Sequence, residues 1–143
     1  MPRLDATRMT AWRNMQATVD AARRAIDYDL RSEWALPLAW FEVLAHLREL
    51  GGVARPNDVA DAMGLPPSSL SRRIDRLEEE GWVVRNHHPD PSDLRAVTVA
   101  LTPRGRHLWR EMNITYRRAV QAHFAGRLTD EEVTALTSTM SRF

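Results

Sequence analysis

Residues 65–85 have the sequence LPPSSLSRRIDRLEEEGWVVR, which predicts a helix followed by a strand. Apolar residues recur there at three- and four-residue spacing, the pattern of one helix face, so Ser68–Glu80 should be helical. Gly81 should end the helix, and Trp82-Val83-Val84 is typical of a strand. The buried side of this helix would consist of Leu70, Ile74 and Leu77.

The neighbouring segments complete a recognisable unit. A shorter helix is predicted at Pro56–Met63, and Gly64 provides a tight turn between the two helices. On the other side, Asn86–Asp93 is rich in proline and aspartate and should form a loop, whereas Ala96–Leu101 alternates like a strand. Two helices joined by a tight turn and followed by a β-hairpin predict a winged helix-turn-helix.

Longer helices are predicted on both sides of this unit. Ala6–Trp34 contains no glycine or proline, and another helix should begin at Pro37. Thr102-Pro103 opens a second long helix that extends to about Ala125, and a capping box of Thr129 and Glu132 opens the last one. The apolar stripe of the first helix consists of Met9, Trp12, Met15, Val19, Ala22, Ile26 and Leu30. Its spacing suits a subunit interface, and a helix packed in the core of one chain is the alternative.

The composition excludes several classes of protein. The 143 residues contain 20 arginines, no lysine, 19 acidic residues and no cysteine, with a net charge of +1. The lack of cysteine excludes disulfide scaffolds, thiolate zinc sites and thiol chemistry. No apolar run approaches a membrane span, and the polar N-terminus does not resemble a signal peptide, so we expect a cytoplasmic protein.

The second helix of this unit, Ser68–Glu80, is the predicted DNA-binding element, and we call it the recognition helix. In helix-turn-helix units the second helix enters the major groove, and arginine and serine side chains suit phosphates and base edges. The groove-facing positions are those not used for the buried face: Ser68, Ser69, Ser71, Arg72, Arg73 and Arg76. The sequence also places Arg85 and Arg95 on the DNA side, and Glu78-Glu79-Glu80 away from it. A merely solvated amphipathic helix is the alternative.

The wing segment resembles that of the MarR family of transcriptional regulators. In DLRAVTVALT, residues 93–102, D-x-R is followed six residues later by L-T. The segments LPPSSLSRRIDRLEEEGWVVR and LTPRGRHLW are similar to the recognition helix and to the start of the long dimerisation helix of that family. The resemblance extends from about Leu36 to Glu111, with compatible helices on both sides.

The resemblance implies a mainly α fold with a small β-hairpin wing. Residues 1–143 would form one chain with a DNA-binding lobe at 36–101 and dimerisation helices at 6–34 and 103–143. Arg95 would reach the minor groove and Asp93 would orient it, with His87 and His88 nearby at the wing tip. Pro66 departs from the family, since proline cannot supply the serine cap that the recognition helix often has.

The resemblance also implies a ligand-responsive repressor that binds a pseudo-palindromic DNA operator as a homodimer. A small aromatic or phenolic effector would sit where the dimerisation helices meet the DNA-binding lobe. The residues that would line this site, or else form ordinary core, are Trp12, Met15, Trp34, Trp40, Trp109 and Met112.

An enzyme and a protein–protein adaptor are the alternatives to a DNA-binding protein. We find no glycine-rich phosphate loop, zinc-protease motif or nucleophile elbow, so we expect no catalytic residues, metal or cofactor. A winged-helix protein–protein adaptor, in which the arginine face is only solvated, is the alternative to a regulator that binds DNA by sequence.

Overall fold

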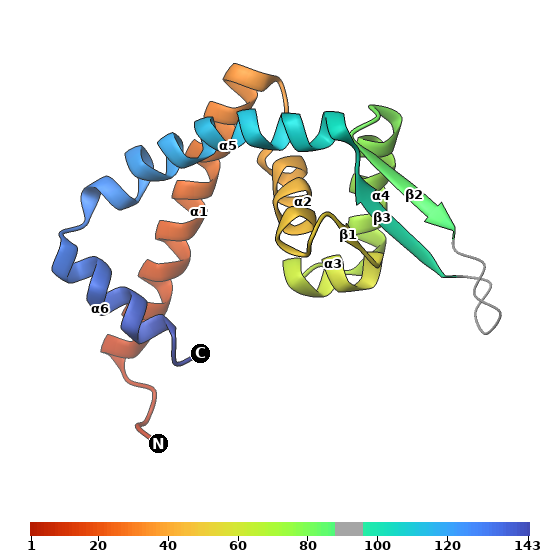
Figure 1. Ribbon diagram of the computed structural model, residues 1–143. Helices are drawn as coiled ribbons and strands as arrows, with labels where there is room; N and C mark the ends of the chain where they lie inside the picture. The colour runs from red at the N-terminus through yellow and green to blue at the C-terminus, as the bar shows by residue number, and fades with distance from the viewer. Residues whose placement is uncertain (88–95) are drawn as a thin grey trace.

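The computed structural model describes residues 1–87 and 96–143, and it is mainly α-helical with one small sheet. Figure 1 shows a lobe formed by α2–α4 and the sheet, from which α1, the end of α5 and α6 extend to one side. The helices are α1 (Ala6–Trp34), α2 (Leu38–Glu49), α3 (Pro56–Met63), α4 (Pro67–Glu79), α5 (Pro103–His123) and α6 (Asp130–Met140), with a 3₁₀ turn η1 (Ala125–Arg127) before α6. The strands are β1 (Val53–Ala54), β2 (Val83–His87) and β3 (Val97–Leu101).

The sheet differs from the predicted hairpin in two respects. Val53–Ala54 forms a third strand that pairs with β3, so that the antiparallel order is β1-β3-β2. β2 also continues two residues into the predicted loop, because Asn86 and His87 pair with Thr98 and Val97. The hairpin prediction is therefore confirmed, but its ladder is longer and one short strand was missed.

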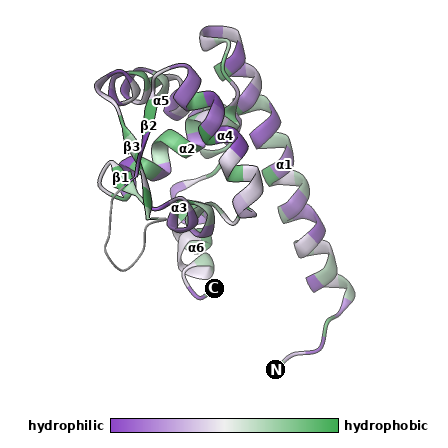
Figure 2. Cartoon of the chain, turned by 90° about the vertical axis from the view of Figure 1, so that its right-hand side faces the viewer, coloured by the Kyte–Doolittle hydropathy of each residue, from purple (hydrophilic) through white to green (hydrophobic). Residues whose placement is uncertain are grey.

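Two hydrophobic clusters hold the chain together. The lobe cluster joins α2, α3, α4, β2 and β3, and its largest members are Leu44, Leu47, Leu70, Ile74 and Leu77. The second cluster joins α1, α2 and α5. Its buried members are Ile26, Leu30, Leu38, Phe41, Met112 and Ala119. In Figure 2 hydrophobic colour accordingly gathers on α2 and the strands.

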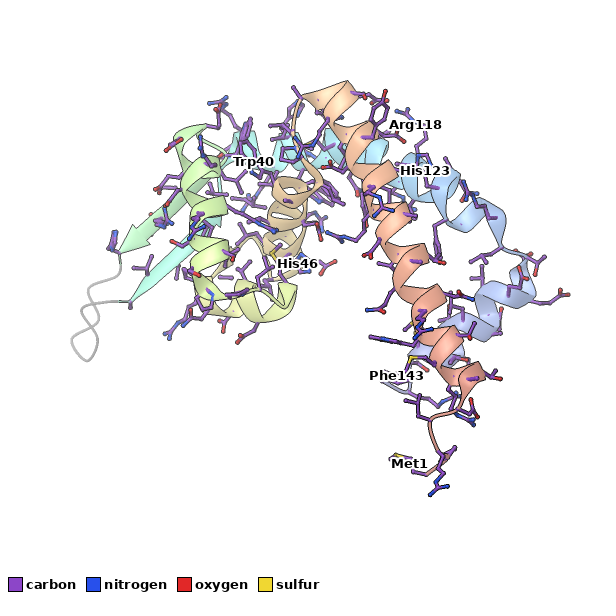
Figure 3. All side chains as sticks on the ribbon, turned by 180° about the vertical axis from the view of Figure 1, so that it is seen from behind. Met1, Trp40, His46, Arg118, His123 and Phe143 are labelled. Atoms are coloured by element: carbon purple, nitrogen blue, oxygen red, sulfur yellow. The ribbon has the colours of Figure 1, made fainter. Side chains whose placement is uncertain are left out.

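Polar contacts also join α5 to the C-terminal half of α1. Buried Thr115 donates from Oγ1 to Glu33 Oε2 at 2.6 Å and accepts from Trp34 Nε1 at 3.0 Å. Arg118 pairs with Glu33, and His123 Nε2 lies 2.8 Å from Asp29 Oδ2. Figure 3 marks Arg118 and His123 on α5 beside α1. Because these contacts reinforce the apolar cluster, α5 connects the wing to α1 as one framework.

The start of α5 is seated on the turn after α4. Thr102 caps the helix by accepting from Gly105 N at 3.0 Å, and it donates to the carbonyl of Gly81 at 2.7 Å. The Thr102 amide donates to the Trp82 carbonyl at 3.1 Å. Gly105 is buried against the same carbonyl, where an added Cβ would lie 1.9 Å from the oxygen. Glycine is therefore required here by close packing.

An aspartate of α1 caps α2. Pro37, the N-cap residue of α2, has no side-chain acceptor, and Asp27 Oδ1 instead accepts from the Leu38 amide at 2.9 Å. Burial opposes ionisation of Asp27, but the Leu38 amide and the nearby Arg31 and Arg23 guanidiniums outweigh it and lower its pKa. The carboxylate form therefore stabilises the folded state.

Replacing Asp27 with alanine should lower the free energy of unfolding at pH 7 by about 1 kcal/mol, because the Leu38 amide loses its acceptor. A lowered pKa means that the stabilisation is complete above the unfolded pKa of about 4 and is lost as the pH falls through the folded value. The difference between wild type and Asp27→Ala in urea unfolding should therefore shrink at acid pH. A difference that stayed constant down to pH 3 would contradict this account.

Candidate nucleic-acid interface

The predicted helix-turn-helix is confirmed in α3 and α4. Gly64 lies between the helices in the left-handed conformation, with φ of 64°, and the Leu65 amide donates back to the Ala60 carbonyl at 2.9 Å. Such a turn suits glycine, since other residues pay a steric penalty there. The turn brings α4 across the lobe with its apolar side inward.

Burial of one side of α4 exposes the other. Leu70, Ile74 and Leu77 are almost completely buried, as predicted. Of the six predicted groove-facing residues, Ser68, Ser71, Arg72 and Arg76 are exposed, whereas Ser69 and Arg73 are half-buried. Their exposure is established, and their contact with DNA remains a prediction.

Arg73 faces a different direction from that predicted. Its guanidinium Nη1 donates to the carbonyl of Ala39 in the first turn of α2, at 3.4 Å. The side chain thus extends from α4 toward α2, and its contact with the groove stays a prediction. The direction of the side chain follows from helical geometry, because position 73 lies beside buried Ile74 at the edge of the packed face.

Arg85 joins the wing to the recognition helix through a network that we call the Arg85 clasp, formed with Ser71, Asp75 and Glu78. Its guanidinium pairs with Asp75 Oδ1 at 2.7 Å and Glu78 Oε1 at 3.0 Å, and donates to the Ser71 carbonyl at 3.2 Å. The Arg85 amide also donates to Glu78 Oε2, at 2.8 Å. The three α4 positions follow i, i+4, i+7 spacing, so they lie on one stripe.

The clasp changes the charge pattern predicted from sequence. Arg85 is engaged by two carboxylates and only 20% of its side chain is exposed, so its placement among the DNA-facing arginines was wrong. Glu78 is part of this network rather than remote from it. Arg85 partly offsets the charge of Asp75, the acidic residue within the basic stretch. Within residues 1–87 and 96–143 neither Arg72 nor Arg76 belongs to an ion pair, so their charges are available to a ligand.

Replacing Arg85 with methionine should weaken DNA binding about tenfold, because two uncompensated carboxylates would then face the phosphates. Adding Asp75→Asn to that variant should recover part of the affinity. Fluorescence anisotropy with one labelled duplex measures both effects. If the single and double variants bound equally well, the charge of Asp75 would have no part in DNA binding.

The N-terminus of α4 has neither a side-chain cap nor an acidic residue in its first turn. Pro66 is the N-cap residue and forms no side-chain cap, and the first turn contains no acidic residue. This agrees with the departure noted in the sequence at Pro66. The positive end of the helix dipole is therefore not offset by a local carboxylate, which favours an approaching phosphate.

The wing is described at its base. His87 is exposed at the last position of β2, opposite Val97 of β3. The other predicted wing-tip residues, His88, Asp93 and Arg95, lie outside the described residues. The described hairpin therefore establishes where the wing leaves the lobe, beside the exposed face of α4.

The predicted effector residues lie in different surroundings. Trp12 and Met15 are exposed on α1, and Met112 is completely buried in the second cluster, against which Trp34 and Trp109 both pack. Trp40 packs against Trp82, with ring centroids 6.4 Å apart. Trp34 borders a cavity beside Trp82 and His107, and Trp109 borders another beneath the Arg48 guanidinium. Their role in binding an effector stays a prediction.

Residues 1–87 and 96–143 contain no cluster of three or more histidine, aspartate and glutamate side chains able to hold a metal ion. Over the same ranges, no helix is both long and apolar enough to cross a membrane.

Comparison with known proteins identifies the family. A family model described as MarR family matches residues 36–96. The multiple antibiotic resistance protein MarR of Escherichia coli is 30% identical over 111 residues, which cover 75% of each chain. The chain belongs to the MarR family. The transcriptional repressor MdtR of Bacillus subtilis is 31% identical over 91 residues, which cover 64% of this chain and 56% of MdtR. The match thus spans about half of that relative's length.

Solved MarR-family structures agree with the fold. Sco3205 of Streptomyces coelicolor, a MarR family regulator solved in complex with DNA, is 28% identical with a TM-score of 0.85 over 99% of this chain and 88% of its own. AbsC of the same organism is 27% identical with a TM-score of 0.83, over 98% and 93%. MdtR is named as a transcriptional repressor, and AbsC and Sco3205 are named as transcriptional regulators.

Proposed function

We propose that this MarR-family protein is a sequence-specific DNA-binding regulator that acts as a homodimeric repressor on a pseudo-palindromic operator. The observation that carries the proposal is the exposed face of α4, where Arg72 and Arg76 form no ion pair within the described residues and Arg85 offsets part of the charge of Asp75 and Glu78. A neutral chain thereby presents a local cationic surface on a helix of the right size for the major groove.

The proposal divides the chain into two functional parts. Residues 36–101 form the DNA-binding lobe, and residues 6–34 and 103–143 form the dimerisation helices. Ser68, Ser69 and Ser71 would contact phosphates or base edges beside the two arginines. We expect His87 at the wing base, and His88, Asp93 and Arg95 beyond the described residues, to contact the adjacent groove.

A second copy of the chain is the partner we propose for the apolar surface of α1 and α6. α6 has no buried residue in the part of the chain that the structure describes, and a short exposed helix gains little stability alone. The exposed apolar residues are 38–52% accessible: Trp12, Met15, Val19, Val133, Leu136 and Met140. Light scattering should therefore give twice the chain mass of 16.4 kDa.

A flat aromatic effector remains part of the proposal, with one revised location. Trp34 and Trp82 border a single cavity together with His107 and Glu111 of α5. This cavity lies where α1 and α5 meet the lobe, so a ligand bound there would contact both functional parts. The residues offer two indole surfaces and titratable side chains for recognition.

Footprinting on the DNA upstream of the protein's own coding sequence tests the proposal. We expect two protected half-sites about 34–36 Å apart on one face of the duplex, as a symmetric dimer requires. The preference for this site over random duplex should persist when added salt weakens both affinities. Equal binding to random duplex, or none to either, would favour the protein–protein adaptor.

A further inference from the structure

A cavity of about 630 Å³ opens between the end of α2, the glycine turn before β1 and the first turns of α5. That volume is within the range of small-molecule sites, about 300–1,000 Å³. None of the residues that line it comes from α3, α4 or β2, the elements of the proposed DNA-binding face. The cavity is therefore separate from that face, and also from the cavity beside Trp34.

Among the described residues, three arginines and no carboxylate line this cavity. Arg48, Arg106 and Arg110 are all exposed, and none of them belongs to an ion pair within the described residues. Like charges that converge on a concave surface focus a positive potential, which attracts anions. The cavity should therefore concentrate a negatively charged ligand.

The backbone and the aromatic ring hold two of these arginines in place. The Arg48 guanidinium carbon lies 4.4 Å from the centroid of the Trp109 ring, at cation–π distance. Arg106 lies against Gly52, where an added Cβ would be 3.1 Å from Nη2. A side chain at position 52 would press on this guanidinium, so the glycine leaves room for it. Positioned guanidiniums lose less entropy when they bind a ligand.

The remaining wall is apolar and consists of Leu101, Pro103 and Trp109. The apolar part of a ligand could cover the leucine and the proline while its charged part meets the guanidiniums.

We infer that this cavity binds a small phosphate monoester with a compact apolar or aromatic group. A monoester carries close to two negative charges at neutral pH, which three guanidiniums match better than the single charge of a carboxylate. Guanidinium forks bind phosphate oxygens in bidentate geometry. A small molecule fits better than a DNA backbone phosphate, because the site is concave and partly apolar. The inference does not depend on the proposed function.

Phenyl phosphate, titrated into the full-length protein by calorimetry, tests this inference. The assigned ¹H–¹⁵N signal of the Trp109 indole provides a second, local measurement. Arg106→Ala should weaken binding about tenfold, and Arg106→Ala with Arg110→Ala about a hundredfold. Arg106→Lys keeps the charge but loses the bidentate guanidinium geometry. Its affinity for phenyl phosphate should lie between those of the wild type and Arg106→Ala. Arg117→Ala, an exposed arginine of α5 outside the cavity, should bind like wild type.

Three results would overturn the assignment. Equal binding of phenol and phenyl phosphate would show an apolar cavity without anion selectivity. Equal loss in Arg106→Ala and Arg117→Ala would show a nonspecific effect of net charge. A Trp109 signal that responds to duplex DNA and not to phenyl phosphate would assign these arginines to DNA instead. Thermal unfolding of each variant checks that the fold is retained.

Discussion

Replacing Gly105 with alanine should lower the free energy of unfolding by about 3 kcal/mol, although the same change inside a helix ordinarily raises it by about 1 kcal/mol. The added methyl group would lie 1.9 Å from the Trp82 carbonyl oxygen and 2.9 Å from its carbon. That carbonyl accepts from the Thr102 amide, so it cannot move without disturbing the start of α5. Urea denaturation followed by circular dichroism measures the change.

Gly51→Ala is the matched control for this prediction. Gly51 has φ of 93°, and within the described chain no atom lies within 4 Å of an added Cβ, so alanine there meets backbone strain and no clash. We expect a loss of about 1 kcal/mol. Equal losses in the two variants would mean that the contact with Trp82 relaxes freely, and a stabilised Gly105→Ala would refute the close packing of α5 on the turn.

Replacing both Arg72 and Arg76 with alanine should reduce operator affinity about a thousandfold, since the dimer loses four arginines and each is expected to contribute about 1 kcal/mol. If all four contact phosphates, the slope of log affinity against log salt should fall by about four. If one arginine of each chain reads a base edge, that slope falls by about two and the sequence preference relaxes. Anisotropy titrations at several salt concentrations distinguish these cases.

The control for that variant removes the same charge elsewhere. Arg24 and Arg117 are exposed on α1 and α5, and the described parts of the chain contain no ion pair to either. Arg24→Ala with Arg117→Ala should keep most of the operator affinity. A similar loss in both double variants would show that net charge, rather than the exposed face of α4, governs binding. Light scattering verifies that both variants keep their molar mass.

Helices with a strong local signal could be predicted closely from the sequence. The bounds of α1 and α3 coincide with the prediction, and the capping box of Thr129 and Glu132 is present with both hydrogen bonds. Helical periodicity and capping residues are local features of the sequence, so they can be recognised without knowledge of the tertiary structure. β1 was missed because two residues carry no periodicity, and its pairing with Ala100 and Val99 is set by the folded lobe.

The position of the candidate site could be predicted from the sequence, but the hydrogen bonds and ion pairs of its arginines could not. The exposed face of α4 follows directly from the buried spacing of its leucines and isoleucine. The roles of Arg73 and Arg85 depend on the groups that they contact on other elements, and the spacing of residues in the sequence does not reveal those contacts. One signal was available for Arg85: it shares a strand face with buried Val83, so it points toward α4 rather than away from it.

The aromatic residues show the same limit. Trp12, Trp34 and Trp109 all satisfy helical spacing, and their types alone suggested a common crevice. Trp12 lies on the exposed stripe of α1, whereas Trp34 and Trp109 pack against the same cluster but border two different cavities. Residue type predicts a preference for apolar surroundings, but the path of the chain decides which side chains share them.

The continuity of β3 and α5 has a mechanical consequence. A single residue, Thr102, separates the wing strand from a 21-residue helix of about 32 Å. If α5 tilts by about 6° about its C-terminal end, its N-terminal end beside the wing moves by about 3 Å. That displacement is close to the 3.4 Å step between base pairs. Small rotations where two copies meet would therefore shift the register of the two recognition helices by a whole base-pair step.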